Sequence, residues 1–302
     1  MTPRVASIGE CMVELRERPD GLLHRSHGGD TLNTAVYLAR LGVAVDYVTA
    51  LGDDPWSDEM VARWAEEGVG TSLVQRLPGR LPGLYIIETD ARGERRFLYW
   101  RDSAAARQLW DHLDPAALAS FDLIYLSGIS LSIYDAAARA RLFTSLEACR
   151  ASGARVAFDT NFRPRGWPDP AVARQLYSRM FALADVVLAS AEDLHLLFGE
   201  AGESELLHRA QGREVVLKLE EPGSRVLFDG TDIPVQAGPV PHVVDTTAAG
   251  DSFSAAYLAA RLRGVDPVQA ARAGHALAGI VVGHPGAIMP LAAMPLSVET
   301  RS

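Results

Sequence analysis

The residues best placed to do chemistry stand in one run, DTTAAGD, at residues 245–251. The small side chains at 248–250 leave room for a phosphate to approach the backbone. A helical pattern follows over 254–263, and the unpaired N–H groups at the start of a helix favour an anion. Asp251 stands beside that anion, where its carboxylate can accept the proton of an attacking hydroxyl. The run predicts an anion hole with a general base; a helix capped by Asp251 is the simpler alternative.

A second run, GGDTLNTA at residues 28–35, also leads into a helical pattern. Gly28 and Gly29 carry no side chain, so the backbone can lie close to a sugar. Gly29, Asp30 and Asn33 are candidates for contacts with its hydroxyl groups. For Asp30, a role as N-cap of the helix that follows is the competing interpretation.

Together the two runs resemble the paired signatures of the pfkB (ribokinase-like) carbohydrate kinases, which are a glycine pair with an asparagine and an Asp-Thr-x-Ala/Gly-Ala-Gly-Asp run. The resemblance implies phosphoryl transfer from ATP, with Mg²⁺, to a sugar hydroxyl. It implies that Asp251 is the base and that the anion hole is formed by the backbone of Ala248, Ala249, Gly250 and Asp251. Most members carry glycine where this chain has Ala248, a variant that is similar to the 2-keto-3-deoxygluconate kinases.

The run DTNFRP at residues 159–164 follows an apolar strand, and ligands bind at the carboxyl ends of parallel strands. It resembles the Asp-x-Asn-x-Arg run of the keto-deoxy-sugar branch of the family. The resemblance implies that Arg163 pairs with a carboxylate or a phosphate and that Asn161 contributes to the nucleotide side. A polar loop in which Asn161 caps a turn is the alternative.

Tyr99 and Arg101 alternate with Trp100 along a strand and therefore share one face. This segment also resembles the keto-deoxygluconate kinases, which implies that Tyr85, Tyr99 and Arg101 clamp the carboxylate and hydroxyl groups of a sugar acid. A surface strand that carries a cation–π pair is the alternative.

The nucleotide side is assigned by resemblance alone. Ser190 and Asp193 stand where the family has Asn-x-x-Glu, which implies that Ser190 contributes to the phosphate site and that Asp193 acts on Mg²⁺ through water. A serine N-cap with an acid in the first turn is compatible with that role. The other implied nucleotide contacts are Lys218, Gly223 and His275. Glu220, where a glycine is more usual, departs from the family pattern.

Composition narrows the class of protein. The chain has 302 residues, 48% of them apolar, and a net charge of −9 without a long basic run, which argues against a nucleic-acid partner. Cys11 and Cys149 form neither a disulfide framework nor a zinc pattern. No apolar stretch approaches the ~20 residues that span a bilayer, and the first residues lack a signal pattern. We therefore expect a cytoplasmic protein with no membrane partner.

Short apolar strands alternate with helical patterns, which predicts an α/β fold with a doubly wound, mostly parallel sheet flanked by helices. The strands are expected at 5–8, 45–51, 84–89, 96–100, 123–126, 156–158, 186–188, 215–219 and 226–228. The helices with the clearest ends are expected at 31–41, 55–67, 134–151 and 254–263.

The strands at 84–89 and 96–100 differ from the others because residues 90–94 between them give a hairpin signal. The resemblance implies a small antiparallel β lid built from residues 12–27 and 83–102, inserted in a single ribokinase-like domain over 1–302. It also implies a homo-oligomer in which the open faces of the lids pair between subunits.

These observations predict an ATP-dependent kinase that converts 2-keto-3-deoxy-D-gluconate to 2-keto-3-deoxy-6-phosphogluconate, with the sugar acid and ATP as its small-molecule partners. One alternative is a fructokinase or another neutral-sugar kinase, but two arginines aimed at the sugar argue against it, because an unpaired buried cation is costly. Another is a catalytically silent sugar-binding regulator, against which Asp251 and the small-residue run argue.

Overall fold

The computed structural model describes residues 2–18, 20–89, 95–219 and 221–295. The expected hairpin turn at 90–94 and Glu220 lie outside the described residues. The strands are β1 (Arg4–Ile8), β2 (Met12–Glu17), β3 (Leu23–Gly28), β4 (Ala44–Leu51), β5 (Val74–Arg76), β6 (Leu84–Thr89), β7 (Arg95–Trp100), β8 (Leu123–Ser127), β9 (Arg155–Asp159), β10 (Val186–Ser190), β11 (Glu214–Lys218), β12 (Gly223–Phe228) and β13 (Thr231–Gln236). The α-helices are α1 (Asp30–Arg40), α2 (Pro55–Glu66), α3 (Leu109–His112), α4 (Gly128–Ile133), α5 (Ala136–Ala151), α6 (Pro170–Leu183), α7 (Ala191–Phe198), α8 (Gly202–Arg209), α9 (Ala249–Leu262) and α10 (Pro267–Val281).

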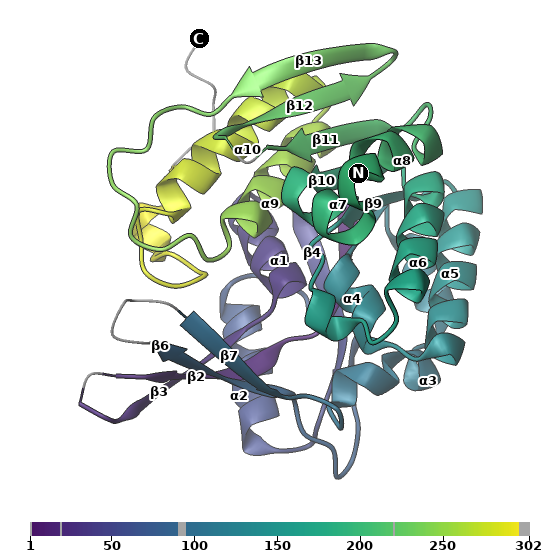
Figure 1. The fold of residues 1–302 in the computed structure, drawn as a ribbon. Helices are drawn as coiled ribbons and strands as arrows, with labels where there is room; N and C mark the ends of the chain where they lie inside the picture. The colour runs from purple at the N-terminus through teal and green to yellow at the C-terminus, as the bar shows by residue number, and fades with distance from the viewer. Residues whose placement is uncertain (1, 19, 90–94, 220, 296–302) are drawn as a thin grey trace.

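The larger sheet has nine strands in the order β13-β12-β11-β10-β9-β8-β1-β4-β5 (Figure 1). Its strands pair in parallel except at one edge, where β12 and β13 are antiparallel. The doubly wound, mostly parallel sheet expected from the sequence is therefore confirmed.

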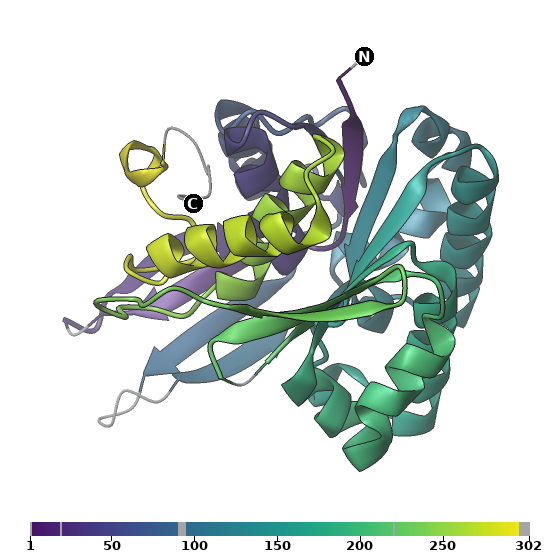
Figure 2. The same cartoon turned by 90° about the horizontal axis from the view of Figure 1, so that it is seen from above.

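Both faces of this sheet are buried, because alternate residues of each strand point to opposite sides. In β8, Leu123 and Tyr125 join a core under α1, α2, α9 and α10, whereas Ile124 and Leu126 join a second core under α3 to α8. Figure 2 shows helices on both sides of the sheet. This double burial explains why the strands read as apolar runs without alternation.

Local sequence explains most helix ends. Asp54 and Asp266 accept hydrogen bonds from the first N–H groups of α2 and α10, and each is followed by a proline that suits the first helical position. One helix start differs from expectation by more than a turn: α9 begins at Ala249, not at residue 254. Asp251 is therefore the third residue of α9 and lies in its first turn.

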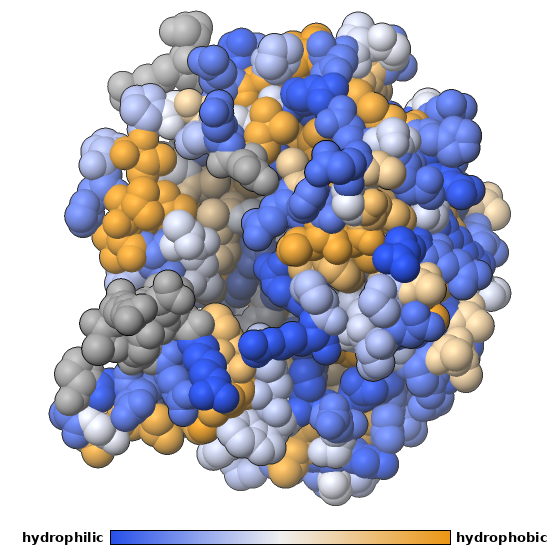
Figure 3. All heavy atoms as spheres, in the orientation of Figure 1, coloured by the Kyte–Doolittle hydropathy of each residue, from blue (hydrophilic) through white to orange (hydrophobic). Residues whose placement is uncertain are grey.

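The second sheet, called the lid here, contains β3, β2, β6 and β7 in that order. Strand β2 is antiparallel to β3, and β6 is antiparallel to β7. The two inner strands, β2 and β6, run parallel to each other. In Figure 1 the lid lies below α1 and beside the body. Figure 3 shows this face hollowed between the lid and the body, with hydrophilic residues along the right side of the hollow.

Strand order reverses at β1, which has β4 on one side and β8 on the other. Ligands of open α/β sheets bind outside the carboxyl ends of the strands at such a point. The residues that end β1, β8, β9, β10 and β11 therefore converge near the start of α1. No helix in the described part of the chain combines the length and apolar character needed to cross a membrane.

Close packing between α9 and α10 supplies a test of the fold. A Cβ atom on Gly274 would lie 2.7 Å from two ring carbons of Phe253, two residues after Asp251. We expect Gly274→Ala to lower the free energy of unfolding by about 1–2 kcal/mol, because overpacking outweighs the gain in helix propensity. Gly279→Ala, whose Cβ would meet the side chain of Val240 at 3.4 Å, is the control and should be neutral or stabilising. Urea unfolding measures both, and an unchanged Gly274→Ala midpoint would contradict the packing argument.

Candidate active site

The predicted base lies at the contact between two helices. The Asn33 Nδ2 amide of α1 donates a hydrogen bond of 2.8 Å to Asp251 Oδ2, and Thr34 Oγ1 lies 3.3 Å from the Asp251 carbonyl oxygen. Two sequence-predicted residues, 218 positions apart, are thus in direct contact. The amide fixes one oxygen of the carboxylate and leaves the other able to accept a proton.

The surroundings of Asp251 raise the pKa of its carboxyl group toward neutral pH. The pKa of Asp251 is raised to about 8, chiefly by burial and next by the nearby Asp30 carboxylate. The Asn33 hydrogen bond and the Lys218 ammonium act in the opposite direction. A carboxyl group with such a pKa can both take and release a proton near neutral pH, which suits a general base.

The turn before α9 is strained at one residue. Ala248 has φ 60° and ψ 16°, the left-handed conformation, which costs a residue with a Cβ roughly 1–2 kcal/mol. No side chain caps the start of α9. The N–H groups of Gly250 and Asp251 lie at this uncapped helix start, where an anion is favoured, and the anion hole stays a prediction.

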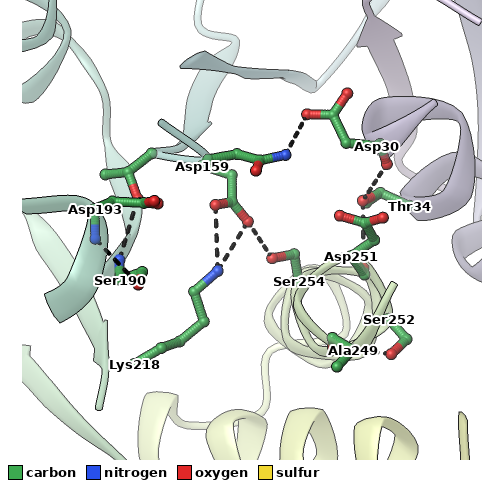
Figure 4. A network of polar contacts seen from close by, with 12 residues as sticks. Asp30, Thr34, Asp159, Ser190, Asp193, Lys218, Ala249, Asp251, Ser252 and Ser254 are labelled. Carbon is green, nitrogen blue, oxygen red and sulfur yellow. Dashed lines mark hydrogen bonds and ion pairs between the residues drawn. The ribbon is translucent and has the colours of Figure 1, made fainter. Parts of the chain in front are cut away.

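A cation lies beside this turn. Lys218 ends β11, and its Nζ atom would lie 3.7 Å from a Cβ on Gly250. The ammonium donates to both carboxylate oxygens of Asp159 at 3.1 and 3.2 Å, and Ser254 Oγ donates to Asp159 at 2.7 Å (Figure 4). Asp159, at the end of β9, therefore holds Lys218 next to the start of α9.

Asp30 is the first residue of α1, and Gly29 takes the N-cap position. The N-cap interpretation of Asp30 is therefore wrong. Its carboxylate accepts a 2.7 Å hydrogen bond from Asn161 Nδ2, whose residue has a positive φ of 26°. Burial raises the pKa of Asp30, while hydrogen bonds from Ser127 and Asn161 oppose that rise.

Ser190 and Asp193 form the second part of the network in Figure 4. Ser190 caps α7, as the simpler interpretation expected, and its Oγ accepts from the Asp193 N–H at 3.4 Å. Thr160 Oγ1 donates to Asp193 Oδ2 at 2.7 Å, and an Arg163 Nη1 atom lies 3.7 Å from Asp193 Oδ1. Burial raises the pKa of Asp193, and these contacts limit the rise.

The three lid residues predicted to clamp the sugar acid lie together. The Tyr85 and Tyr99 rings are 5.9 Å apart, and the Arg101 guanidinium lies 5.7 Å from the Tyr99 ring. Two of the three polar groups already have partners. Tyr85 donates its hydroxyl hydrogen to Glu14, and Arg101 forms an ion pair with Glu10.

The glycine pair is explained by packing of the protein itself. A Cβ on Gly29 would lie 2.2 Å from the Glu10 carbonyl oxygen, and one on Gly28 would lie 2.7 Å from the Tyr85 hydroxyl. Neither position admits a side chain. The pair lets the start of α1 approach the β1–β2 connection and the lid.

The contacts that the structure gives for Gly223 and His275 do not include Asp251, Asp30, Asp159 or Asp193. Gly223 begins β12, opposite Gln236 in β13. His275 Nε2 lies 2.9 Å from Ser224 Oγ, and its ring packs edge-on against Phe253 at 4.8 Å. Burial lowers the pKa of His275 to about 4, so the ring is neutral at physiological pH. The structure thus gives His275 a packing role beside the Lys218 end of the sheet.

Sequence reasoning left out two buried acids and two hydroxyl groups that join these residues. Asp159 is the last residue of β9 and Glu10 stands two residues after β1, and an acid at the end of an apolar strand is a signal for the carboxyl edge of a sheet. Thr160 and Ser254 gave no comparable signal, because a buried hydroxyl is recognised only once its partner is known.

A family model described as pfkB family carbohydrate kinase matches residues 2–294. The chain belongs to the pfkB family of carbohydrate kinases. It is 50% identical to the 2-dehydro-3-deoxygluconokinase of Dickeya dadantii, over 97% of this chain and 99% of that protein. It is 45% identical to the 2-dehydro-3-deoxygluconokinase of Escherichia coli K12, over 98% and 100%. The crystal structure of a fructokinase with bound ATP from Xylella fastidiosa superimposes with a TM-score of 0.85 at 28% identity, covering 98% of this chain and 96% of that one.

The charges around Asp251 predict opposite shifts in the pH profile of this pfkB kinase. The base must be ionised, so kcat/KM should fall about tenfold per pH unit below the Asp251 pKa of about 8. Asp30→Asn removes a like charge and should move this acid limb to lower pH. Lys218→Met removes an opposite charge and should move it to higher pH. Initial rates between pH 5.5 and 9.5 test the pair, and shifts of the same sign in both variants would refute this account.

Proposed function

We propose that this kinase transfers the terminal phosphoryl group of ATP to the terminal hydroxyl of 2-keto-3-deoxy-D-gluconate, giving 2-keto-3-deoxy-6-phosphogluconate. The observation that carries the proposal is the partly buried Asp251 carboxylate, held by Asn33 in the first turn of α9. The 45–50% identity to proteins named 2-dehydro-3-deoxygluconokinase, another name for the same activity, supports the substrate.

Three groups of this chain have separate roles in the proposed phosphoryl transfer. Asp251 accepts the proton of the attacking hydroxyl, and the N–H groups of Gly250 and Asp251, at the uncapped start of α9, bind the charge that develops on the transferring group. Lys218, held by Asp159, adds a positive charge beside them. Phosphoryl transfer relies mostly on such positioning and charge stabilisation.

The sugar acid requires positive charge near the lid. Arg163 keeps a 61% exposed side chain, with one hydrogen bond to the Phe162 carbonyl oxygen and a longer contact to Asp193. Its remaining N–H donors are available to a carboxylate or a phosphate. Arg101 with Tyr85 and Tyr99 provides a second polar surface, and we propose that these four residues hold the sugar acid.

ATP and Mg²⁺ are part of the proposal. Among the described residues, no three His, Cys, Asp or Glu side chains gather to bind a metal ion directly. Asp193, whose oxygens already contact Thr160 and Arg163, fits a contact through water better than direct coordination. When bound with ATP, Mg²⁺ supplies charge neutralisation on the phosphates. We assign Asn161, Ser190, Gly223 and His275 to the nucleotide side, with His275 acting through packing.

We also propose that residues 1–302 form one kinase domain with the lid inserted in it, and that a homo-oligomer forms through the lid. The exposed side chains of Leu23 and Trp100, which the strand register places on the same face of the lid, support this, because apolar surface favours burial. The free thiols of Cys11 and Cys149 support a cytoplasmic location.

The function is tested by ATP consumption with 2-keto-3-deoxy-D-gluconate, its galacto epimer, fructose and ribose. We expect turnover with the keto-deoxy acid and a loss on the order of 10²- to 10⁴-fold in kcat for Asp251→Asn, with sugar binding retained. Fructose as the better substrate would indicate a neutral-sugar kinase. Sugar binding without ATP consumption would indicate a silent regulator.

Asp193 is tested by titrating Mg²⁺ at saturating sugar and ATP. Asp193→Ala should raise the Mg²⁺ requirement by about 10- to 100-fold, because an acid that orients metal-bound water typically contributes that much. Glu192→Ala is the control, since Glu192 is an exposed acid in the same helical turn. A lower melting temperature with an unaltered Mg²⁺ curve would show that Asp193 only stabilises the start of α7.

A further inference from the structure

Glu10 and Arg101 form a buried ion pair between the body and the lid. Glu10 lies between β1 and β2, and Arg101 directly follows β7. The Arg101 Nη2 group donates to Glu10 Oε2. The Glu10 side chain is 1% exposed and the Arg101 side chain 20% exposed, so Glu10 lies behind the guanidinium and Arg101 faces outward.

The Glu10–Arg101 pair has one hydrogen bond instead of the usual two. Glu10 Oε1 and Arg101 Nε are both buried, and neither has a hydrogen-bond partner among the described residues. An arginine and a carboxylate usually pair through two parallel hydrogen bonds, and unpaired buried polar atoms are costly. Gly83 is required for this arrangement, because a Cβ there would lie 2.7 Å from Glu10 Oε1. The guanidinium thus retains donors for a second carboxylate.

The charges that face Glu10 come from three other segments. Arg101 and Arg107 favour its ionised form, and Asp30 at the start of α1 opposes it. The Cys11 thiol and the Tyr134 ring are the neighbouring groups that remain neutral, since burial raises the pKa of each. Burial likewise raises the pKa of Glu10 above its usual 4.5, against the attraction of Arg101.

We propose that Glu10 is a specificity-determining residue: its carboxylate neutralises Arg101 until the carboxylate of a sugar acid binds the same guanidinium, and Glu10 then takes up a proton from solvent. The inference rests on the proposed function in one respect, which is that Arg101 binds the acid group of the substrate. A neutral sugar brings no charge to replace that of Glu10, so it leaves the Glu10–Arg101 pair intact and gains nothing from Arg101.

The sign of the pH dependence follows from this exchange. A second carboxylate beside Arg101 makes protonation of Glu10 easier, so Glu10 has a higher pKa with sugar acid bound than without it. Affinity is therefore full below the pKa of the free protein. It falls about tenfold per pH unit between the free and bound pKa values, and it is constant above the bound value.

The experiment measures binding of 2-keto-3-deoxy-D-gluconate by calorimetry between pH 5 and 9, in buffers of different ionisation enthalpy and without ATP. Asp251→Asn is the background, so that titration of Asp251 does not contribute. We expect uptake of a fraction of a proton, approaching one, together with loss of affinity as pH rises. Adding Glu10→Gln, which keeps an oxygen to accept from Arg101, should abolish proton uptake and strengthen binding about tenfold at pH 8.

Glu17→Gln is the matched control, because Glu17 is an exposed glutamate at the end of β2, the strand that follows Glu10, and it should bind as the background does. Weaker binding in Glu10→Gln by a constant factor at every pH would overturn the proposal and leave Glu10 as a structural support. If Glu10→Gln does not fold, absence of proton uptake in the background protein overturns the proposal by itself.

The outcomes also separate this inference from the proposed function. Phosphorylation of the keto-deoxy acid without proton uptake refutes the role of Glu10 alone. Proton-linked binding of the acid without phosphorylation of it by the wild type refutes the proposed function alone. A protein that binds no sugar acid refutes both.

Discussion

Burial of carboxylates at one edge of a parallel sheet is the constraint on which this structure depends. Four aspartates lie where the strands end and α1 and α9 begin: Asp159 and Asp193 are buried, and Asp30 and Asp251 are partly buried. An isolated buried carboxylate is expensive, so each needs donors or a raised pKa. The donors come from side chains on neighbouring strands and helices, and Lys218 pairs with one of the four acids. The electrostatic balance of the site therefore controls how readily Asp251 ionises.

Acidic side chains also pair with polar groups of the lid. Two glutamates near the lid hold polar groups that we propose contact the sugar acid, since Glu14 accepts from Tyr85 and Glu10 pairs with Arg101. Each pair places an acid beside one of these proposed substrate contacts. The lid is thus prepared for a ligand that brings its own negative charge, and a chain with a net charge of −9 needs such local positive groups to bind an anion.

Close approach of backbone segments fixes the geometry in which these charges act. Gly29 lets the start of α1 lie against the Glu10 carbonyl oxygen, and the left-handed Ala248 directs the first N–H groups of α9 outward. The strain at Ala248 persists because the helix behind it is packed on α10 and α1. Strain and close packing are therefore concentrated around the residues of the candidate active site.

The sequence by itself determined the alternation of strands and helices, the sheet type, the family and the two runs that contain Asn33 and Asp251, but it gave no signal for β5 or β13. These follow from local patterns, since apolar periodicity, small residues and helix ends act over a few positions. Only the tertiary structure decided that Asp30 meets Asn161, 131 residues away, and that Glu10 holds Arg101, 91 residues away. It also decided that α9 starts before Asp251. Periodicity carries no information about which distant side chains meet, because those contacts depend on how the two sheets and their helices pack.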